Sequence, residues 1–246
     1  MRKFLLATAI GAVMAPGILH ANELPDVDAD AEGTHWSGNG ELGLALSRGN
    51  TDSQTLLGRL SLAREDERWK HEAGLAFQYG QQDDIDSAYR YEAFGKTGLR
   101  LGERSRLSGS ARTERDHFAA YEYQSTAAFS YGHDAVKTEA THLDFEIGPG
   151  YRWSKLQGVR VHENGGVVRG LMDFGHRFND STSVYDTLLV EAGRDNTFAR
   201  NEAGVQVRMS DALALKAGVE VRHNTDVLPG IHRTDTLTTV NVSYGF

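Results

Sequence analysis

Residues 69–79, with the sequence WKHEAGLAFQY, alternate apolar and polar side chains from one end to the other. One side of this stretch carries Trp69, His71, Ala73, Leu75, Phe77 and Tyr79, and the other carries Lys70, Glu72, Gly74, Ala76 and Gln78. A period of two is typical of a β-strand with one apolar face. Strands of soluble sheets are usually about 5–6 residues long, whereas a strand that crosses a bilayer at a tilt needs about 9–11. The stretch therefore predicts a membrane-crossing strand.

Similar segments, separated by Gly, Asn, Asp and Ser, continue in both directions. Together they predict twelve strands at 35–47, 53–65, 67–80, 89–102, 104–115, 119–132, 139–154, 164–178, 181–194, 200–209, 211–223 and 233–246. An even number of strands suits a closed bacterial barrel with both termini on the periplasmic side. We expect mostly short turns at that end and longer loops at the other, including 81–88, 155–163, 195–200 and 224–232.

The distribution of charge distinguishes a membrane barrel from a soluble sandwich. In the seven strands that alternate most cleanly, no Asp, Glu, Lys or Arg lies on the apolar face. Their polar faces carry Lys70, Glu72, Arg90, Glu92, Lys96, Arg100, Glu122, Asp144, Glu146, Arg152, Arg169, Asp173, Arg177, Glu202, Arg208, Lys216, Glu220 and Arg222. The sequence thus predicts an all-β protein, a closed antiparallel transmembrane β-barrel with these charges in its lumen.

The N-terminus has the layout of an exported protein. Arg2 and Lys3 precede an apolar run from Phe4 to Met14, and Ala21 offers a small residue for cleavage. We expect a signal peptide at 1–21, a flexible acidic periplasmic tail at 22–34 and an outer-membrane barrel at 35–246 of a Gram-negative bacterium. The net charge of −8 argues against a nucleic-acid partner, which needs a basic surface. No cofactor is expected.

Aromatic residues are predicted at both membrane interfaces. Trp36, Trp69, Tyr131, Phe178 and Phe246 fall near the periplasmic side, and Tyr79, Tyr89, Tyr121 and Trp153 near the outer side. The chain ends on Val240, Val242, Tyr244 and Phe246 on one face. This ending resembles the C-terminal signal by which the barrel assembly machinery recognises outer-membrane proteins. Pro149 lies inside a predicted strand, where its missing N–H predicts a β-bulge.

Several segments resemble one family. They are the Gly49-Asn50-Thr51 turn, the segment from Glu146 to Trp153, the turn and strand from Ser210 to Lys216, and the ending from Asp235 to Phe246. The chain resembles, from about Trp36 to Phe246, the uncharacterised outer-membrane barrels often labelled salt-induced outer membrane proteins. The resemblance implies the fold and the location. Its label implies a contribution to envelope integrity under salt or osmotic stress, and it implies no catalytic residues.

Motifs for chemistry are weak. The histidines are scattered, with no spacing typical of a metal site. Some twelve-stranded membrane barrels are lipid-modifying hydrolases, and a nucleophilic set here would have to combine His142 with Ser125 or Thr126. No strained turn that would activate the nucleophile is visible. The sequence predicts no enzyme, and a lipid hydrolase stays as an alternative.

The charged lumen allows two interpretations. Rings of charge could set the ion preference of a small channel, or long side chains of both signs could pair and close the interior. Open aqueous porins usually have sixteen or more strands, which favours a closed or narrow barrel here. Membrane lipids, including lipopolysaccharide, are the expected partners outside. Their phosphates could pair with basic residues of the predicted loops, namely Arg48, Arg115, Lys155, Arg160, Arg194, Arg200 and Arg233.

Overall fold

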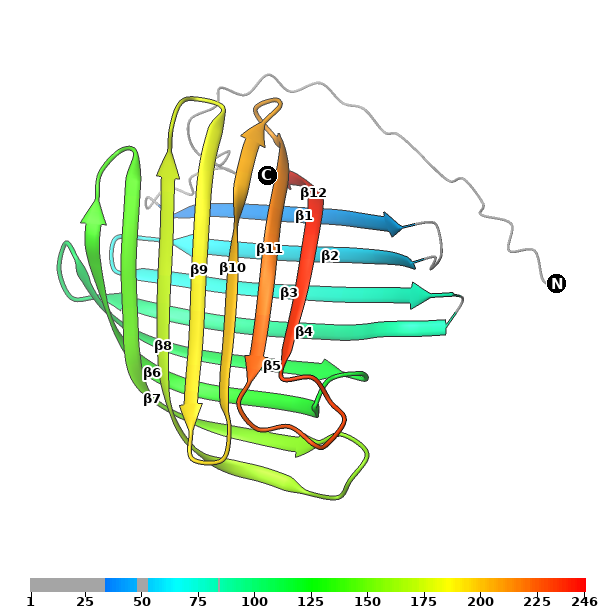
Figure 1. Ribbon diagram of the computed structural model, residues 1–246. Coiled ribbons are helices and arrows are strands. Elements are labelled where there is room, and N and C mark those ends of the chain that lie inside the picture. The colour runs from blue at the N-terminus through cyan, green and yellow to red at the C-terminus, as the bar shows by residue number, and fades with distance from the viewer. Residues whose placement is uncertain (1–33, 48–52, 84) are drawn as a thin grey trace.

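The alternating segments form a closed barrel in the computed structural model of the chain, which describes residues 34–47, 53–83 and 85–246 (Figure 1). The strands are β1 His35–Ser47, β2 Ser53–Glu65, β3 Trp69–Gln82, β4 Ile85–Arg100, β5 Ser105–Asp116, β6 Tyr121–Lys137, β7 Thr141–Leu156, β8 His162–Arg177, β9 Thr182–Gly193, β10 Thr197–Arg208, β11 Leu213–Asn224 and β12 Thr234–Gly245. The expected signal peptide at 1–21, and the expected tail as far as residue 33, lie outside the described residues. No helix among the described residues is long and apolar enough to cross a membrane.

Each strand pairs antiparallel with its neighbours in the chain, and β1 pairs with β12 to close the ring. The closing ladder runs only from Asn39↔Gly245 to Gly43↔Asn241. The last residue extends it, because the Phe246 N–H donates to the Gly38 carbonyl at 2.9 Å and the Gly38 N–H donates to the Phe246 carbonyl at 2.6 Å. In Figure 1, β8–β12 run across β1–β5 in a different direction, as expected for strongly tilted strands on two opposite walls.

Burial is inverted relative to a soluble protein. Phe129 and Ile147 are 77% and 62% exposed, whereas Glu146 and Glu191 are 2% and 1% exposed. Large apolar side chains therefore cover the outer surface and charged ones fill the interior, as in membrane barrels. The predicted closed, twelve-stranded antiparallel barrel is confirmed.

Side-chain oxygens cap the short turns at one end of the barrel. Asp66 accepts the backbone N–H of Trp69 at 2.7 Å, and Asn179 accepts that of Thr182 at 2.9 Å. Such side-chain acceptors replace ladder hydrogen bonds where a strand reverses. We call this the terminal end, because β1 begins there and β12 ends there. The opposite end is the loop end.

The loop end is more compact than predicted. The expected loop at 81–88 is almost entirely strand, since β3 continues to Gln82 and β4 begins at Ile85. The hydroxyl of Tyr79 donates to Asp86 at 2.7 Å and holds these extensions together. Polar residues can continue a ladder above the apolar belt, so composition alone does not show where such a strand ends. The β11–β12 loop, residues 225–233, does keep its predicted length.

The bulge predicted at Pro149 is wrong. The β7–β8 register passes through Pro149↔Val168 without a shift, and the β6–β7 register is the same at Ala128↔Gly150 and Tyr131↔Ile147. Instead Gly148 lies so close to β6 that an added Cβ would overlap the Phe129 carbonyl oxygen. A glycine beside the proline thus allows a close backbone approach with the register intact.

Shifts in register occur elsewhere in β6, between Tyr121 and Tyr123 and between Asp134 and Val136. The first one reverses the alternation near the loop end. Tyr121 is 3% exposed, so its predicted place at the outer interface is wrong. It faces inward, and its hydroxyl donates to Glu163 at 2.7 Å.

Candidate functional site

The barrel interior is filled by two groups of paired charges. The trans-lumen cluster lies in the middle and towards the loop end and contains Glu41, Arg59, Arg90, Glu92, Arg112, Glu114, Glu191, Arg200, Glu202, Lys216, Glu220 and Arg222. The terminal cluster lies nearer the terminal end and contains Lys70, Glu72, Lys96, Arg106, Asp134, Asp144, Glu146 and Arg169.

Ion pairs in the trans-lumen cluster join opposite walls. Arg200 of β10 donates to both carboxylate oxygens of Glu92 of β4 at 2.9 Å. Six steps around the ring separate β10 from β4, so these strands face each other. The pair between Arg222 of β11 and Glu114 of β5 also spans six steps. Side chains that meet in this way occupy the space through which a solute would have to pass.

Two further pairs cross the lumen beside these. Arg59 of β2 makes a bidentate contact with Glu202 of β10, with both distances at 2.9 Å. Arg90 of β4 lies 2.8 Å from Glu220 of β11. The planar guanidinium matches a carboxylate in the first of these pairs, which restricts both side chains.

Arg112 is the hub of the trans-lumen cluster. Its nitrogens lie 3.0 Å from Glu114, 3.2 Å from Glu191 and 3.5 Å from Glu92. The ring of Phe198, which is 2% exposed, lies 4.8 Å from the guanidinium group of Arg112 and 5.2 Å from that of Arg222. The two like charges thus share favourable cation–π contacts with one aromatic ring.

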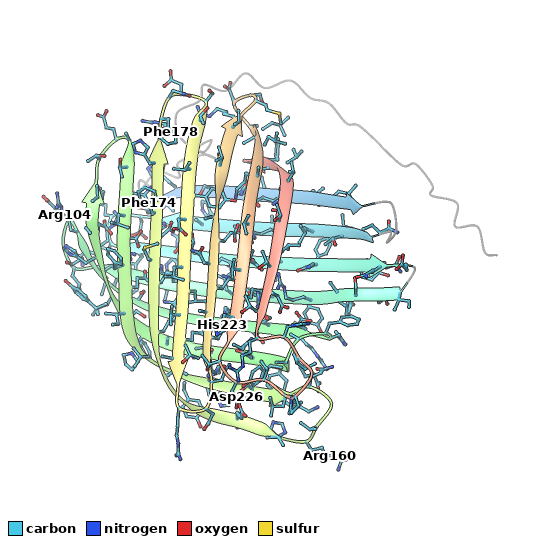
Figure 2. The ribbon with its side chains drawn as sticks, in the orientation of Figure 1. Arg104, Arg160, Phe174, Phe178, His223 and Asp226 are labelled. Carbon is cyan, nitrogen blue, oxygen red and sulfur yellow. The ribbon has the colours of Figure 1, made fainter. Side chains whose placement is uncertain are left out.

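The β11–β12 loop covers the loop end of the interior. The buried Asn196 donates to Asn224 at 2.7 Å and accepts the backbone N–H of Asp226 at 3.1 Å. Val227 and Leu228 pack on a buried group formed by Ala120, Tyr121 and Leu156, which comes from the β5–β6 loop and the ends of β6 and β7. Figure 2 shows Asp226 at this end, and Phe178 at the opposite, terminal end.

The terminal cluster centres on Glu146, whose side chain has no solvent exposure. It accepts hydrogen bonds from Arg106 at 3.0 Å and Arg169 at 3.4 Å, and Lys96 lies 2.5 Å away. A carboxylate without water is stabilised only when several cations surround it, as here.

A cavity of about 680 Å³ separates the trans-lumen cluster from the terminal end. It extends from Thr141 and His176, near the β6–β7 and β8–β9 turns, to Glu220 and Arg222. Its walls carry as many acidic as basic side chains, so they favour neither sign of ion.

Most predicted lumen charges lie in these two clusters. Five others lie nearer the openings. Arg152 donates to the Asn196 carbonyl at the loop end, while Arg100, Asp173 and Arg177 pair near the terminal end with Glu65, His142 and the Glu139 carbonyl. Arg208 is near the terminal end of β10.

The lumenal position predicted for Glu122 is wrong. Arg115 and Lys155 bind it, and each lies on the side of its strand opposite to the buried Glu114 and Ser154. The register shift after Tyr121 turns Glu122 to the outer surface. Arg200, which the sequence suggested as a loop residue, lies in β10 and faces Glu92.

The sequence prediction missed Glu41, Arg59, Arg106, Arg112, Glu114, Asp134 and Glu191. Most of them belong to strands whose alternation is less clean. In β5, Arg106, Arg112 and Glu114 have the same parity, but Arg115, which lies on the opposite face, obscures the pattern. The leucines at 56, 60 and 62 were a usable signal in β2, because they put Arg59 on the opposite face.

The structure does not bring together the suggested hydrolase residues. His142 is at the terminal end of β7, beside Asp173 at 3.6 Å. Ser125 lies on the outer surface near the loop end and shares a hydrogen bond with Thr113 at 2.8 Å, while Thr126 faces inward and donates to Glu191 at 2.9 Å. Within the described ranges, no three His, Asp or Glu side chains are grouped to hold a metal ion.

Comparisons with known proteins agree with this fold. Residues 40–246 match the family described as "Protein of unknown function, DUF481". The uncharacterized protein YdiY of Escherichia coli K12 is 22% identical over 221 residues, which cover 85% of this chain and 82% of that protein. An outer-membrane channel from Pseudomonas putida F1 superposes with a TM-score of 0.52 at 10% identity, over 92% of this chain and all of that one. The translocator domain of the autotransporter NalP from Neisseria meningitidis has a TM-score of 0.44 at 14% identity, over 89% of this chain and 90% of that one. At 10% identity the likeness to the Pseudomonas channel shows a shared barrel fold and nothing about activity.

Proposed function

Since the chain belongs to DUF481, a family of proteins of unknown function, we propose a role from the barrel interior itself: a non-enzymatic outer-membrane scaffold whose lumen is closed. The observation that carries the proposal is the set of ion pairs between opposite walls, Arg200 with Glu92 and Arg222 with Glu114. Each pair spans the width of the lumen, and the β11–β12 loop covers the same end.

The surface of the barrel supports an outer-membrane location. An apolar outer wall with aromatic residues near both ends suits a bilayer, and barrels of this kind belong to the bacterial outer membrane. The terminal end then faces the periplasm and the loop end faces outward. We also propose that the segment 1–21 directs export of the chain. Val240, Val242, Tyr244 and Phe246 would present the C-terminal strand to the barrel assembly machinery.

A closed barrel would act through its wall and its two surfaces, by stabilising the envelope around it. The resemblance to barrels labelled salt-induced suggests that this matters under salt or osmotic stress. A deletion strain should then grow more slowly than its parent in high salt, and a plasmid copy of the gene should restore growth. Equal growth of the two strains would remove the stress element and leave the closed barrel untouched.

A small ion or solute channel is the second candidate. The cavity of about 680 Å³ favours it, because it brings solvent space from the terminal end to the trans-lumen cluster. Among the described residues, that cluster and the loop above it would have to move for a path to form. A lipid hydrolase is a weaker alternative, and incubation of the purified barrel with phospholipid should yield no product in a mass spectrum.

Conductance across a planar bilayer decides between the two main candidates. The native barrel, refolded and verified, should give no current steps. The double substitution Arg200→Ala with Glu92→Ala removes both partners of a trans-lumen pair, so it leaves no unpaired charge and should open discrete steps. The matched control is Arg100→Ala with Glu65→Ala, an exposed pair near the terminal end, which should stay silent. Discrete steps from the native barrel, with an ion preference that changes in the Arg200 and Glu92 variant, would show a channel and refute the closed scaffold.

A further inference from the structure

The outer surface near the loop end carries a row of polar and aromatic side chains that the lumen does not explain. Neighbouring strands bring these residues together through the ladder pairs Tyr91↔Arg115, Arg115↔Tyr123, Tyr123↔Lys155 and Lys155↔His162. Arg115 and Lys155 each lie one residue before the end of their strand. We call these five residues, with Glu122, the rim row.

Both cations of the rim row are accessible. The side chain of Arg115 is 47% exposed and that of Lys155 is 28% exposed. Glu122 holds them side by side, accepting one hydrogen bond from Arg115 at 3.0 Å and one from Lys155. A guanidinium has five N–H groups and an ammonium has three, so most of their donors stay free for a ligand. The group carries one net positive charge.

An apolar trough adjoins the rim row on the same outer surface. Its floor consists of small side chains from β4, β5 and β6, including Ala93, Ala111 and Ala127. Leu60 and Leu75 form one wall and Trp153 forms the other. This hollow measures about 510 Å³.

A second hollow of about 1010 Å³ continues from it and reaches Arg115 and Tyr123. The two hollows share Leu60, Leu75, Ala93, Thr113 and Ser125. The second one extends away from the rim row as far as Leu42 and Val242, on β1 and β12. The tilt of the strands therefore joins cations at the membrane interface to an apolar surface that runs towards the bilayer centre.

We propose that this outer surface binds one molecule of lipid A, the phosphorylated, multiply acylated glycolipid of the outer leaflet. Its phosphate would contact Arg115 and Lys155, with Tyr91 and Tyr123 beside the sugar, and its acyl chains would lie in the trough. Charge complementarity selects a phosphate over a neutral headgroup. Two adjoining hollows select a lipid with several chains over one with two. The site requires the outer-membrane location proposed above, and it does not depend on whether the lumen conducts.

Native mass spectrometry of the refolded barrel in detergent micelles, titrated with diphosphoryl lipid A, tests the proposal. The native barrel should retain one lipid. Arg115→Gln with Lys155→Gln should weaken retention by at least about tenfold, since two charge-assisted contacts are lost. Arg64→Gln is the matched control, because this outward arginine lies at the other interface, over the ring of Trp36. It should bind like the native barrel.

Two further variants separate lipid binding from a purely structural role. Glu122→Gln removes the carboxylate that competes with a phosphate for Arg115 and Lys155. It should therefore strengthen retention of lipid A, even though it weakens the two ion pairs within the rim row. Ala111→Phe fills the trough without changing charge and should weaken retention. Heat-modifiable migration on gels confirms the fold of each variant, so that failure to fold is distinguished from failure to bind.

Three results would overturn the proposal. They are unchanged retention in the Arg115 and Lys155 variant, equal retention of dephosphorylated lipid A, and equal competition by phosphatidylglycerol. The last result would mean that any anionic lipid surrounds this wall. Loss of lipid binding with a silent bilayer would leave the closed scaffold standing.

Discussion

Replacing Arg112 with Met tests whether the lumen is a closed interior or a water-filled passage. The side chain of Arg112 is 9% exposed and contacts Glu92, Glu114 and Glu191. Methionine keeps much of the length, and its methylene groups can still contact Phe198. The change therefore removes the charge and leaves most of the volume.

Most of the stability lost in Arg112→Met should come from one carboxylate. Glu92 keeps Arg200 and Glu114 keeps Arg222. Glu191 is 1% exposed, and its carboxylate keeps the hydroxyl of Thr126 as a hydrogen-bond partner among the described residues, while the nearby Arg152 donates to its backbone carbonyl at 3.3 Å. Leaving a buried charge without its partner costs about 3–5 kcal/mol. In a water-filled passage the same loss would cost about 0–1 kcal/mol, because solvent would replace the partner. We expect a loss of about 3–5 kcal/mol in the free energy of unfolding.

A second substitution should change the free energy of unfolding in the opposite direction. Glu191→Gln neutralises the stranded carboxylate, and its amide oxygen can still accept from Thr126. The variant with both substitutions should therefore be more stable than Arg112→Met alone. Urea unfolding of the barrel from lipid vesicles, followed by tryptophan fluorescence, measures all four proteins of the cycle. A loss below about 1 kcal/mol for Arg112→Met, or a further loss on adding Glu191→Gln, would refute a closed trans-lumen cluster that excludes water.

Three other predictions concern the wall. Gly148→Ala should lower the free energy of unfolding by about 3 kcal/mol or more, or prevent refolding, because its Cβ would overlap the Phe129 carbonyl oxygen and approach the Ser130 Cα to 2.7 Å. Gly95→Ala is the control and should be tolerated, because open space surrounds Gly95. Equal effects of the two substitutions in urea unfolding would contradict this prediction. Asp186 and Asn201 form a hydrogen bond on the lipid-facing side of β9 and β10. Asp186→Leu should stabilise the barrel by about 1–2 kcal/mol, because it removes an acidic side chain from the lipid-facing surface. A loss of stability would instead indicate a polar neighbour in the membrane. Phe246→Ala should lower the folded, heat-modifiable fraction recovered from outer membranes more than the yield of refolding in vitro; equal yields in cells would argue against a role of the ring in assembly.

Much of this protein follows from its sequence alone, because a strand has a period of two. Alternation along β3, β7 and β11 decides which side chains face inward, and it does so independently of where any neighbouring strand lies. The buried positions of Glu146 and Arg222 could therefore be predicted without knowledge of their partners. Strand number and the apolar outer wall follow from the same local pattern.

What only the tertiary structure decides is which charges meet, and where the alternation breaks. Arg59 and Glu202 are 143 residues apart in the chain and pair only because closure of β1 on β12 sets the stagger of the whole ring. One additional residue in β6 turns Glu122 outward, and with it creates the rim row. A register shift of this kind depends on the ladder between two strands, so neither strand shows it in its own sequence.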